Sequence, residues 1–154
     1  MVTPRTSRAK QKGIALVETV IVTPVLLLLI MLTAEITNAF VDHNTLTKYT
    51  RNGARYLSAN ALIGTTGTVA VTAQLVADTR NLVVYGNVSG GGTPILAGLS
   101  PGSVQVLDIG GNNIQVSVTY PYTGLLGGTL PGFGFGTDSN LNMNLRATIA
   151  MRAL

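Results

Sequence analysis

The chain has 154 residues, enough for one domain but not comfortably for two. Hydrophobic residues make up 46% and charged residues only 10%, against about 25% charged in an ordinary soluble protein, which points to a membrane segment. Because there is no cysteine, disulfides and thiolate metal sites are excluded.

The net charge of +4 comes from the N-terminus. From Ile14 onward, six basic side chains balance six acidic ones. A basic segment directly before an apolar run is a topology signal. The charge therefore argues against a nucleic-acid partner, and residues 1–13 are interpreted as a basic leader. Its basic residues are Arg5, Arg8, Lys10 and Lys12.

Residues 19–34 carry no charge, and counted from Ile14 the apolar stretch reaches twenty-one residues, interrupted only by Glu18. As a helix, this stretch spans about 31 Å, close to the roughly 30 Å hydrocarbon core of a bilayer. The basic leader places the N-terminus in the cytoplasm. We therefore predict a membrane segment at 14–35 and a globular domain at 36–154 outside the cytoplasm.

A cleaved secretory signal is the alternative interpretation of this stretch. Such signals have an apolar region of about 7–15 residues, which is shorter than the one here. The sequence Leu32-Thr33-Ala34 is also a weak cleavage site. These observations favour a helix that stays in the membrane.

Glu18 is a carboxylate just inside the apolar stretch. A charge costs about 2–3 kcal/mol at the bilayer centre and less near the edge, so Glu18 either marks the membrane surface or has a partner. If a peptidase cut after Gly13, Ile14 would carry a new α-amine with a pKa of about 7.7–8.0, largely positive at neutral pH. Glu18 of one subunit would then pair with the Ile14 amine of its neighbour in an apolar bundle, which would set the register between subunits.

The string K-G-I-A-L-V-E, residues 12–18, resembles the prepilin signal of type IV pilins and pseudopilins. In that signal a short basic leader and a Gly precede an apolar helix with Glu at the fifth mature position. The resemblance implies that a dedicated prepilin peptidase cuts between Gly13 and Ile14. Many pilins have Phe or Met where this chain has Ile14, so N-methylation of the new terminus is left open.

Pro24 lies within the apolar stretch. Proline removes a backbone hydrogen bond and kinks a helix, although membrane helices tolerate it. Two interpretations stay open: an incidental kink, or a flexible point that lets the helix repack as it leaves the bilayer.

No strong helix breaker follows before Gly53, and apolar side chains recur at steps of three and four residues. We predict one helix over 14–60, about 70 Å long, whose apolar face carries the globular domain. The residues assigned to that face are Ile36, Phe40, Leu46, Tyr49, Ala54 and Leu57.

After a loop marked by Gly64 and Gly67, the pattern predicts a second helix at 68–79 and a strand at 80–86. Further along, strands at 104–109 and 114–120 flank the turn residues G-G-N-N.

Pro121 is expected to end the second strand of this hairpin. In that strand the buried side chains should be Ile114, Val116, Val118 and Tyr120. A last strand at 141–151 alternates, with Leu141, Met143, Leu145, Ala147, Ile149 and Met151 expected to face inward.

Two more segments are similar to one family. The string G-A-R-Y at 53–56 resembles the segment that follows the membrane helix in TadE-like pseudopilins of the tight-adherence (Tad, or Flp) pilus system, and V-T-Y-P-Y with the C-terminal strand resembles their tail. The predicted fold class is α+β, type IV pilin-like: a long N-terminal helix, a short second helix and a small antiparallel sheet packed on the long helix. The resemblance implies a minor pilin or pseudopilin that acts in adhesion or secretion.

The same resemblance implies the partners and the location. These are the prepilin peptidase, other pilin subunits in a helical assembly, the inner-membrane assembly platform, and membrane lipid before assembly. The protein would start in the bacterial inner membrane and end in a pilus at the cell surface.

Residues 124–137 (G-L-L-G-G-T-L-P-G-F-G-F-G-T) are predicted to form a flexible, partly apolar loop between the last two strands. Phe133 and Phe135 in this loop either tuck under the sheet edge or contact a neighbouring subunit or a surface.

The sequence gives no sign of catalysis. His43 is the only histidine, so neither a transition-metal site nor a nucleophile–base–acid set can be assembled, and we expect no enzyme activity and no cofactor. The remaining alternative to a pilus subunit is a membrane-anchored binding or scaffold protein of a secretion system that never polymerises.

Overall fold

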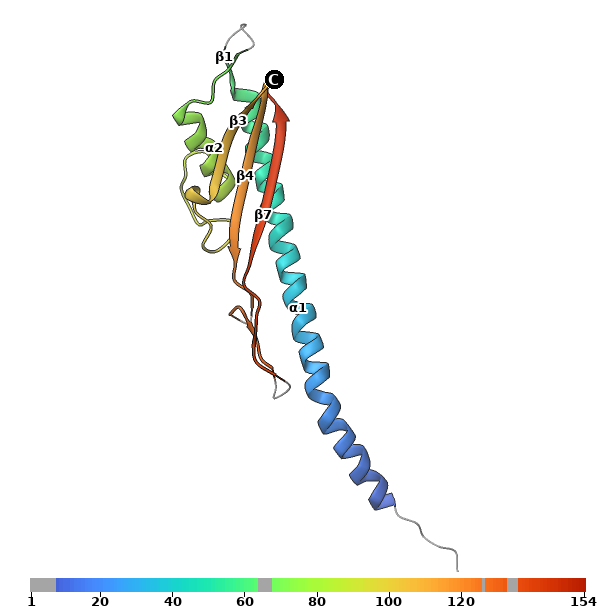
Figure 1. The fold of residues 1–154 in the computed structure, drawn as a ribbon. Coiled ribbons are helices and arrows are strands. Elements are labelled where there is room, and N and C mark those ends of the chain that lie inside the picture. The colour runs from blue at the N-terminus through green and yellow to red at the C-terminus, as the bar shows by residue number, and fades with distance from the viewer. Residues whose placement is uncertain (1–7, 64–67, 126, 133–135) are drawn as a thin grey trace, which may run out of the picture.

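The computed structural model describes residues 8–63, 68–125, 127–132 and 136–154. A single long helix runs the length of the molecule, and a sheet and a second helix gather around its C-terminal half (Figure 1). This is the predicted α+β arrangement. The elements are α1 (Arg8–Asn60), β1 (Leu62–Ile63), β2 (Thr68–Val69), α2 (Ala73–Tyr85), η1 (Pro101–Ser103), β3 (Val104–Gly110), β4 (Asn113–Tyr122), β5 (Thr129–Leu130), β6 (Ser139–Asn140) and β7 (Met143–Arg152).

Helix α1 has 53 residues, which makes it about 80 Å long. It ends at Asn60 as predicted but begins at Arg8, six residues before the predicted start. It also continues unbroken through Pro24. The helix is therefore continuous from Arg8 to the globular part.

The row of buried residues along α1, called the buried line below, differs in part from the apolar face that the sequence predicted. Leu46, Ala54 and Leu57 are fully buried as predicted, but Ile36 and Phe40 are 62% and 64% exposed. They lie ten and six residues before Leu46, which at about 100° per residue turns them a quarter to a third of a turn away from the buried line. The residues that fill the line at its other positions are small or polar: Glu35, Thr50, Gly53 and Ser58.

The second helix corrects two predictions. Residues 68–69 form the short strand β2, paired with β1, and residues 80–85 are the second half of α2 rather than a strand. Thr72 starts the helix, because its hydroxyl accepts a hydrogen bond from the Leu75 amide at 3.2 Å. Val83 and Val84 have strand propensity, but both are fully buried in the core, and that packing overrides local preference.

Helices α1 and α2 meet at Gly53. A Cβ built on Gly53 would overlap Cγ2 of Val83 and would lie 3.5 Å from Cγ2 of Thr79. Glycine at this position therefore allows the two helices to approach closely.

The main sheet has the antiparallel strand order β3-β4-β7. Ile114, Val116, Val118 and Tyr120 on the central strand are buried as predicted. Strand β7 places Ala147 in the core and Leu145, Ile149 and Met151 against it, but Met143 at its start is exposed.

Pro121 does not end β4, which continues to Tyr122. Val118 is the last residue of β4 with a partner on β3, whereas β4 and β7 stay paired to Tyr122 and Met143. Pro121 therefore lies where β4 has a neighbour on only one side, and a missing amide is tolerated at such a position.

The predicted hairpin between β3 and β4 is confirmed. Its two connecting residues, Gly111 and Asn112, have φ values of 62° and 60°, as a type I′ turn requires. The C-terminus is fastened to the end of α1, because the Ser58 hydroxyl donates to the Arg152 carbonyl at 2.6 Å and the Leu154 amide donates to the Ser58 carbonyl at 3.0 Å.

Candidate functional site

The N-terminal half of α1 is an exposed apolar rod. Among the described residues it is the one helix long and apolar enough to cross a membrane, and none of its most apolar window is buried in the protein. Side chains from Ile14 to Ile30 that would be core residues elsewhere face outward. Such a surface is unstable in water, so the helix indicates membrane anchoring.

Four threonine side chains along this helix are hydrogen-bonded within the helix. Thr19, Thr23, Thr33 and Thr37 each donate their hydroxyl to the carbonyl four residues earlier, at 2.7–2.8 Å. This back-bonding removes the need for water or another chain to pair with the hydroxyls. The threonines therefore do not interrupt the apolar surface.

The predicted maturation residues lie together at the start of the rod. Gly13, Ile14 and Glu18 line one open surface groove with Val17 and Ile21, and Glu18 is exposed. Pro24 lies six residues after Glu18, about one and two-thirds turns, and has no amide to donate to the Val20 carbonyl. Glu18 is thus exposed on the apolar surface of the rod.

A second feature lies at the other end of the apolar rod. The connection between β4 and β7, residues 123–142, leaves the sheet and runs down beside α1 (Figure 1). We call this connection the arm. Strands β5 and β6 pair within it, so residues 129–130 of the predicted loop form a short strand. Phe133 and Phe135 lie outside the described residues.

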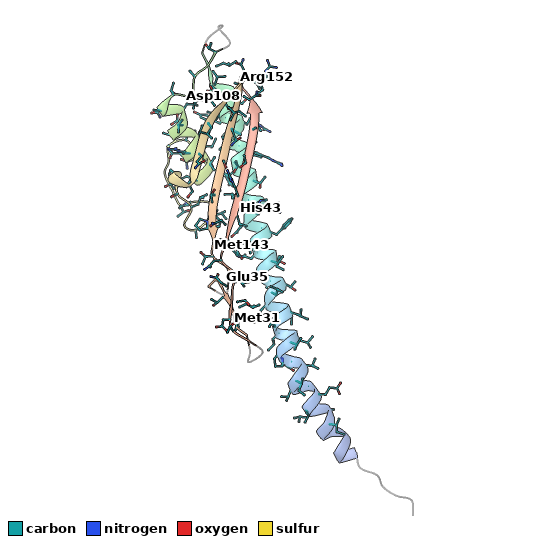
Figure 2. The ribbon with its side chains drawn as sticks, viewed as in Figure 1. Met31, Glu35, His43, Asp108, Met143 and Arg152 are labelled. Carbon is teal, nitrogen blue, oxygen red and sulfur yellow. The ribbon has the colours of Figure 1, made fainter. Side chains whose placement is uncertain are left out.

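Glu35 fastens the arm to α1 (Figure 2). It is only 3% exposed, and its Oε2 accepts a hydrogen bond from the Leu125 amide at 3.1 Å. Its Oε1 is buried without a hydrogen-bond partner among the described residues. A Cβ built on Gly124 would overlap the Glu35 carboxylate, so this approach requires glycine.

Tyr122 holds the start of the arm from the other side. Its hydroxyl donates to the Glu35 carbonyl at 3.3 Å and accepts from the Asn38 side chain at 3.1 Å. Burial raises the pKa of the Tyr122 phenol; the hydrogen bond from Asn38 offsets part of the rise, and the carboxylates of Glu35 and Asp42 add to it. The phenol therefore stays neutral through the physiological range and keeps both hydrogen bonds.

We expect Gly124→Ala to release the arm, because the added methyl group and the Glu35 carboxylate cannot occupy the same space. Limited proteolysis of the detergent-solubilised protein should cut within residues 123–142 severalfold faster. Gly91→Ala, at a loop glycine with nothing within 4 Å, is the matched control and should leave the pattern unchanged. In a Glu35→Ala background Gly124→Ala should add nothing; an equal effect in both backgrounds would contradict the contact.

The protonation of Asp42 is expected to make the stability of the folded protein depend on pH. Burial raises the pKa of its carboxyl above 3.8, so the folded state binds this proton more tightly than the unfolded chain. Protonated Asp42 contributes a stabilisation that is fully present below the pKa of this carboxyl in the unfolded chain. The stabilisation is lost as the pH rises through the pKa of the carboxyl in the folded protein. We therefore expect Asp42→Asn to raise Tm at neutral pH and to leave Tm unchanged at about pH 3. Thermal unfolding at the two pH values checks this, and a gain confined to acid would contradict it.

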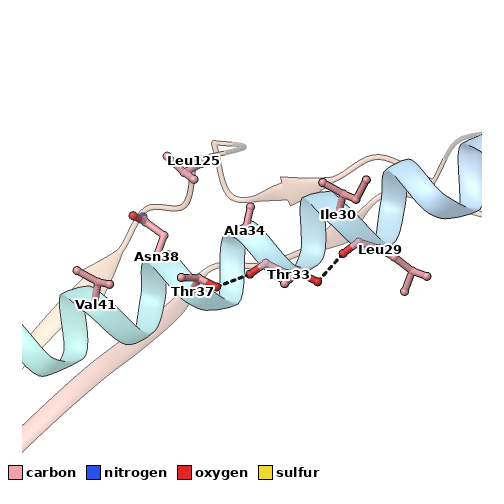
Figure 3. A pocket seen from close by; sticks show the side chains of 8 residues that line it. All are labelled: Leu29, Ile30, Thr33, Ala34, Thr37, Asn38, Val41 and Leu125. Atoms are coloured by element: carbon pink, nitrogen blue, oxygen red, sulfur yellow. Dashed lines mark hydrogen bonds between the residues drawn. The ribbon is translucent and has the colours of Figure 1, made fainter.

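Between α1 and the arm lies an open apolar groove of about 600 Å³ (Figure 3). Leu125 forms its wall on the arm, and seven residues of α1 form the rest: Leu29, Ile30, Thr33, Ala34, Thr37, Asn38 and Val41. Leu125 is 68% exposed and Ile30 is 65% exposed. The groove therefore continues the apolar surface of the rod past the level of Glu35, as far as Val41.

Sequence reasoning found one end of this site and missed the other. In the sequence Glu35 is only the first charge after the apolar run, and its contacts are with residues about ninety positions later. The one signal in the sequence was an acid placed directly after sixteen uncharged residues. That signal does not reveal Gly124 or Tyr122 as its neighbours.

Comparison with known proteins gives a family match for the N-terminal part of the chain. Residues 13–55 match the model of a family described as TadE-like protein. The match confirms the predicted resemblance for the apolar helix and its continuation to Arg55, and it indicates a membrane protein associated with the tight-adherence pilus. No curated protein and no solved structure matches the chain.

Proposed function

We propose that this chain is a structural pilin-like subunit, a pseudopilin or minor pilin, of a Tad-type pilus that acts in adhesion or secretion. The observation that carries the proposal is the exposed apolar rod of α1 with Glu18 near its start. A rod of this kind has two stable surroundings, a bilayer and a bundle of like helices. The match of residues 13–55 to TadE-like protein supports the same assignment.

In this proposal the chain is made with residues 1–13 as a leader. Residues 14–35 hold it in the bacterial inner membrane, with the N-terminus in the cytoplasm and residues 36–154 outside. A prepilin peptidase removes the leader after Gly13. An assembly platform then moves the mature subunit from lipid into a helical filament that reaches the cell surface.

Cleavage supplies a charge that assembly needs. A new α-amine at Ile14 is largely protonated at neutral pH, because α-amines in water have a pKa of about 7.7–8.0. In a bundle, the Glu18 carboxylate of a neighbouring subunit neutralises it, and neither charge is then buried alone. The role is structural, with no catalytic step.

The mature N-terminus tests this proposal directly. Protein from sheared surface filaments should begin at Ile14 when it is examined by mass spectrometry. A chain that still begins at Met1, or one cut after Ala34, would contradict the assignment. Subunits that begin at Ile14 but occur only in the membrane fraction would favour the scaffold protein that does not polymerise.

A further inference from the structure

The arm lies level with the outer end of the predicted membrane segment. Ile14 and Glu35 are twenty-one residues apart on a continuous helix, which corresponds to about 31 Å, so Glu35 falls at the bilayer surface when Ile14 is at the opposite one. The hydrogen bond from the Leu125 amide to Glu35 places the arm at the same depth. From there the arm runs beside α1 toward Leu29 (Figure 3).

The composition of the arm suits this depth. Asp138 is the only charged residue between 123 and 142. Its carboxylate accepts a hydrogen bond from the Gly132 amide at 3.0 Å, so one of its acceptor positions is filled within the arm. The backbone of the arm is also partly paired, through β5 and β6 and through the Leu141 amide, which donates to the Gly128 carbonyl at 2.8 Å.

Three polar side chains of the groove beneath the arm already make hydrogen bonds within the described part of the chain. The hydroxyls of Thr33 and Thr37 donate to carbonyls of their own helix, and the amide of Asn38 donates to Tyr122. The remaining lining is aliphatic. An occupant of this groove therefore meets a mainly apolar lining.

We propose that, before assembly, the groove between α1 and the arm takes up a phospholipid acyl chain, so that Leu125 rests in the outer interface of the membrane. We choose this occupant because the groove is continuous with the predicted membrane segment: four of its lining residues belong to the uncharged run at 19–34. An acyl chain also matches the lining chemically. The arm is then a second point of membrane contact, fastened by Glu35.

This inference rests on the membrane anchoring in the proposed function and is independent of filament assembly. The test uses the full-length chain, whose lack of cysteine allows clean single labels. Leu125→Cys, Ile30→Cys and Ala150→Cys variants are labelled with an environment-sensitive fluorophore and reconstituted in vesicles of phosphatidylethanolamine and phosphatidylglycerol. Ala150 is exposed on β7 and serves as the distant control. Lipids that are spin-labelled near the headgroup or near the chain end act as quenchers.

The label at position 125 should be quenched severalfold more than the label at position 150, and more by the headgroup-proximal quencher than by the deep one. Adding Gly124→Ala should reduce quenching at position 125 toward the level at 150 and leave position 30 unchanged. Quenching at position 30 with none at 125 overturns this inference alone. No quenching at position 30 overturns the anchoring together with it. Self-quenching at position 125 that grows with protein density, without lipid quenching, would mean that a second copy of the chain fills the groove.

Discussion

Glu18→Ala is expected to remove the subunit from sheared surface filaments while its insertion in the membrane stays normal. The substitution makes the apolar segment more hydrophobic, so insertion is not impaired. In the assembled bundle it leaves the Ile14 amine without a carboxylate. Losing one partner of a buried ion pair costs about 3–5 kcal/mol. At about 1.4 kcal/mol for each factor of ten, the fraction of subunit in filaments should fall about a hundredfold or more.

Two further variants separate this effect from a general disturbance of the helix. Thr19→Ala changes the adjacent exposed residue, whose hydroxyl is bonded within the helix, and should assemble normally. Glu18→Asp keeps the charge on a shorter side chain and should retain part of the assembly. Quantitative immunoblots of sheared and membrane fractions provide the measurement. Normal filaments from Glu18→Ala would favour the scaffold protein that does not polymerise.

Gly53→Val is expected to give the largest loss of stability in the globular part. The two helices are too close there for a side chain, because even a Cβ would overlap Cγ2 of Val83. Val83 is fully buried and, as a β-branched residue in a helix, has essentially one available rotamer. The clash therefore has to move the backbone of α2, and we expect a cost of about 3 kcal/mol. Chemical unfolding of the detergent-solubilised protein measures it.

The control for this substitution lies one residue earlier on the same helix. Asn52→Val introduces the same side chain at an exposed position and should change stability little. Combining Gly53→Val with Val83→Ala should restore part of the loss, because the smaller residue frees the space. Losses that simply add in the double variant would show that the two side chains do not compete for space.

The carboxylates at the two ends of the apolar rod, Glu18 and Glu35, have different surroundings. In the proposed function, the charge at the Glu18 end is neutralised by another subunit once the rod leaves the membrane. The end at Glu35 has its carboxylate already covered by the arm of the same chain. Glu18 is thus assigned to contacts between subunits, and Glu35 to the position of the arm within one subunit.

Much of this protein follows from local sequence. The apolar run, the basic leader and Glu18 are contiguous, so membrane anchoring and the family resemblance could be inferred without a structure. The hairpin was predictable for the same reason: alternating apolar residues flank G-G-N-N, and the turn needs only the residues it contains. The end of α1 at Asn60 was also predicted correctly.

Other features were decided only by contacts between distant segments. The valines at 83 and 84 are helical because burial against α1 outweighs their local strand preference, so reading the segment alone gave the wrong element. Ile36 and Phe40 have the spacing of a core face, but the sheet covers a different side of the helix and leaves them exposed. Glu35 acquires its role from Gly124 and Leu125, about ninety residues away, and one local sequence does not specify which distant backbone will approach it. Periodicity thus determined which segments are apolar and where the chain turns, whereas close packing at Gly53 and Gly124 decided which surfaces meet.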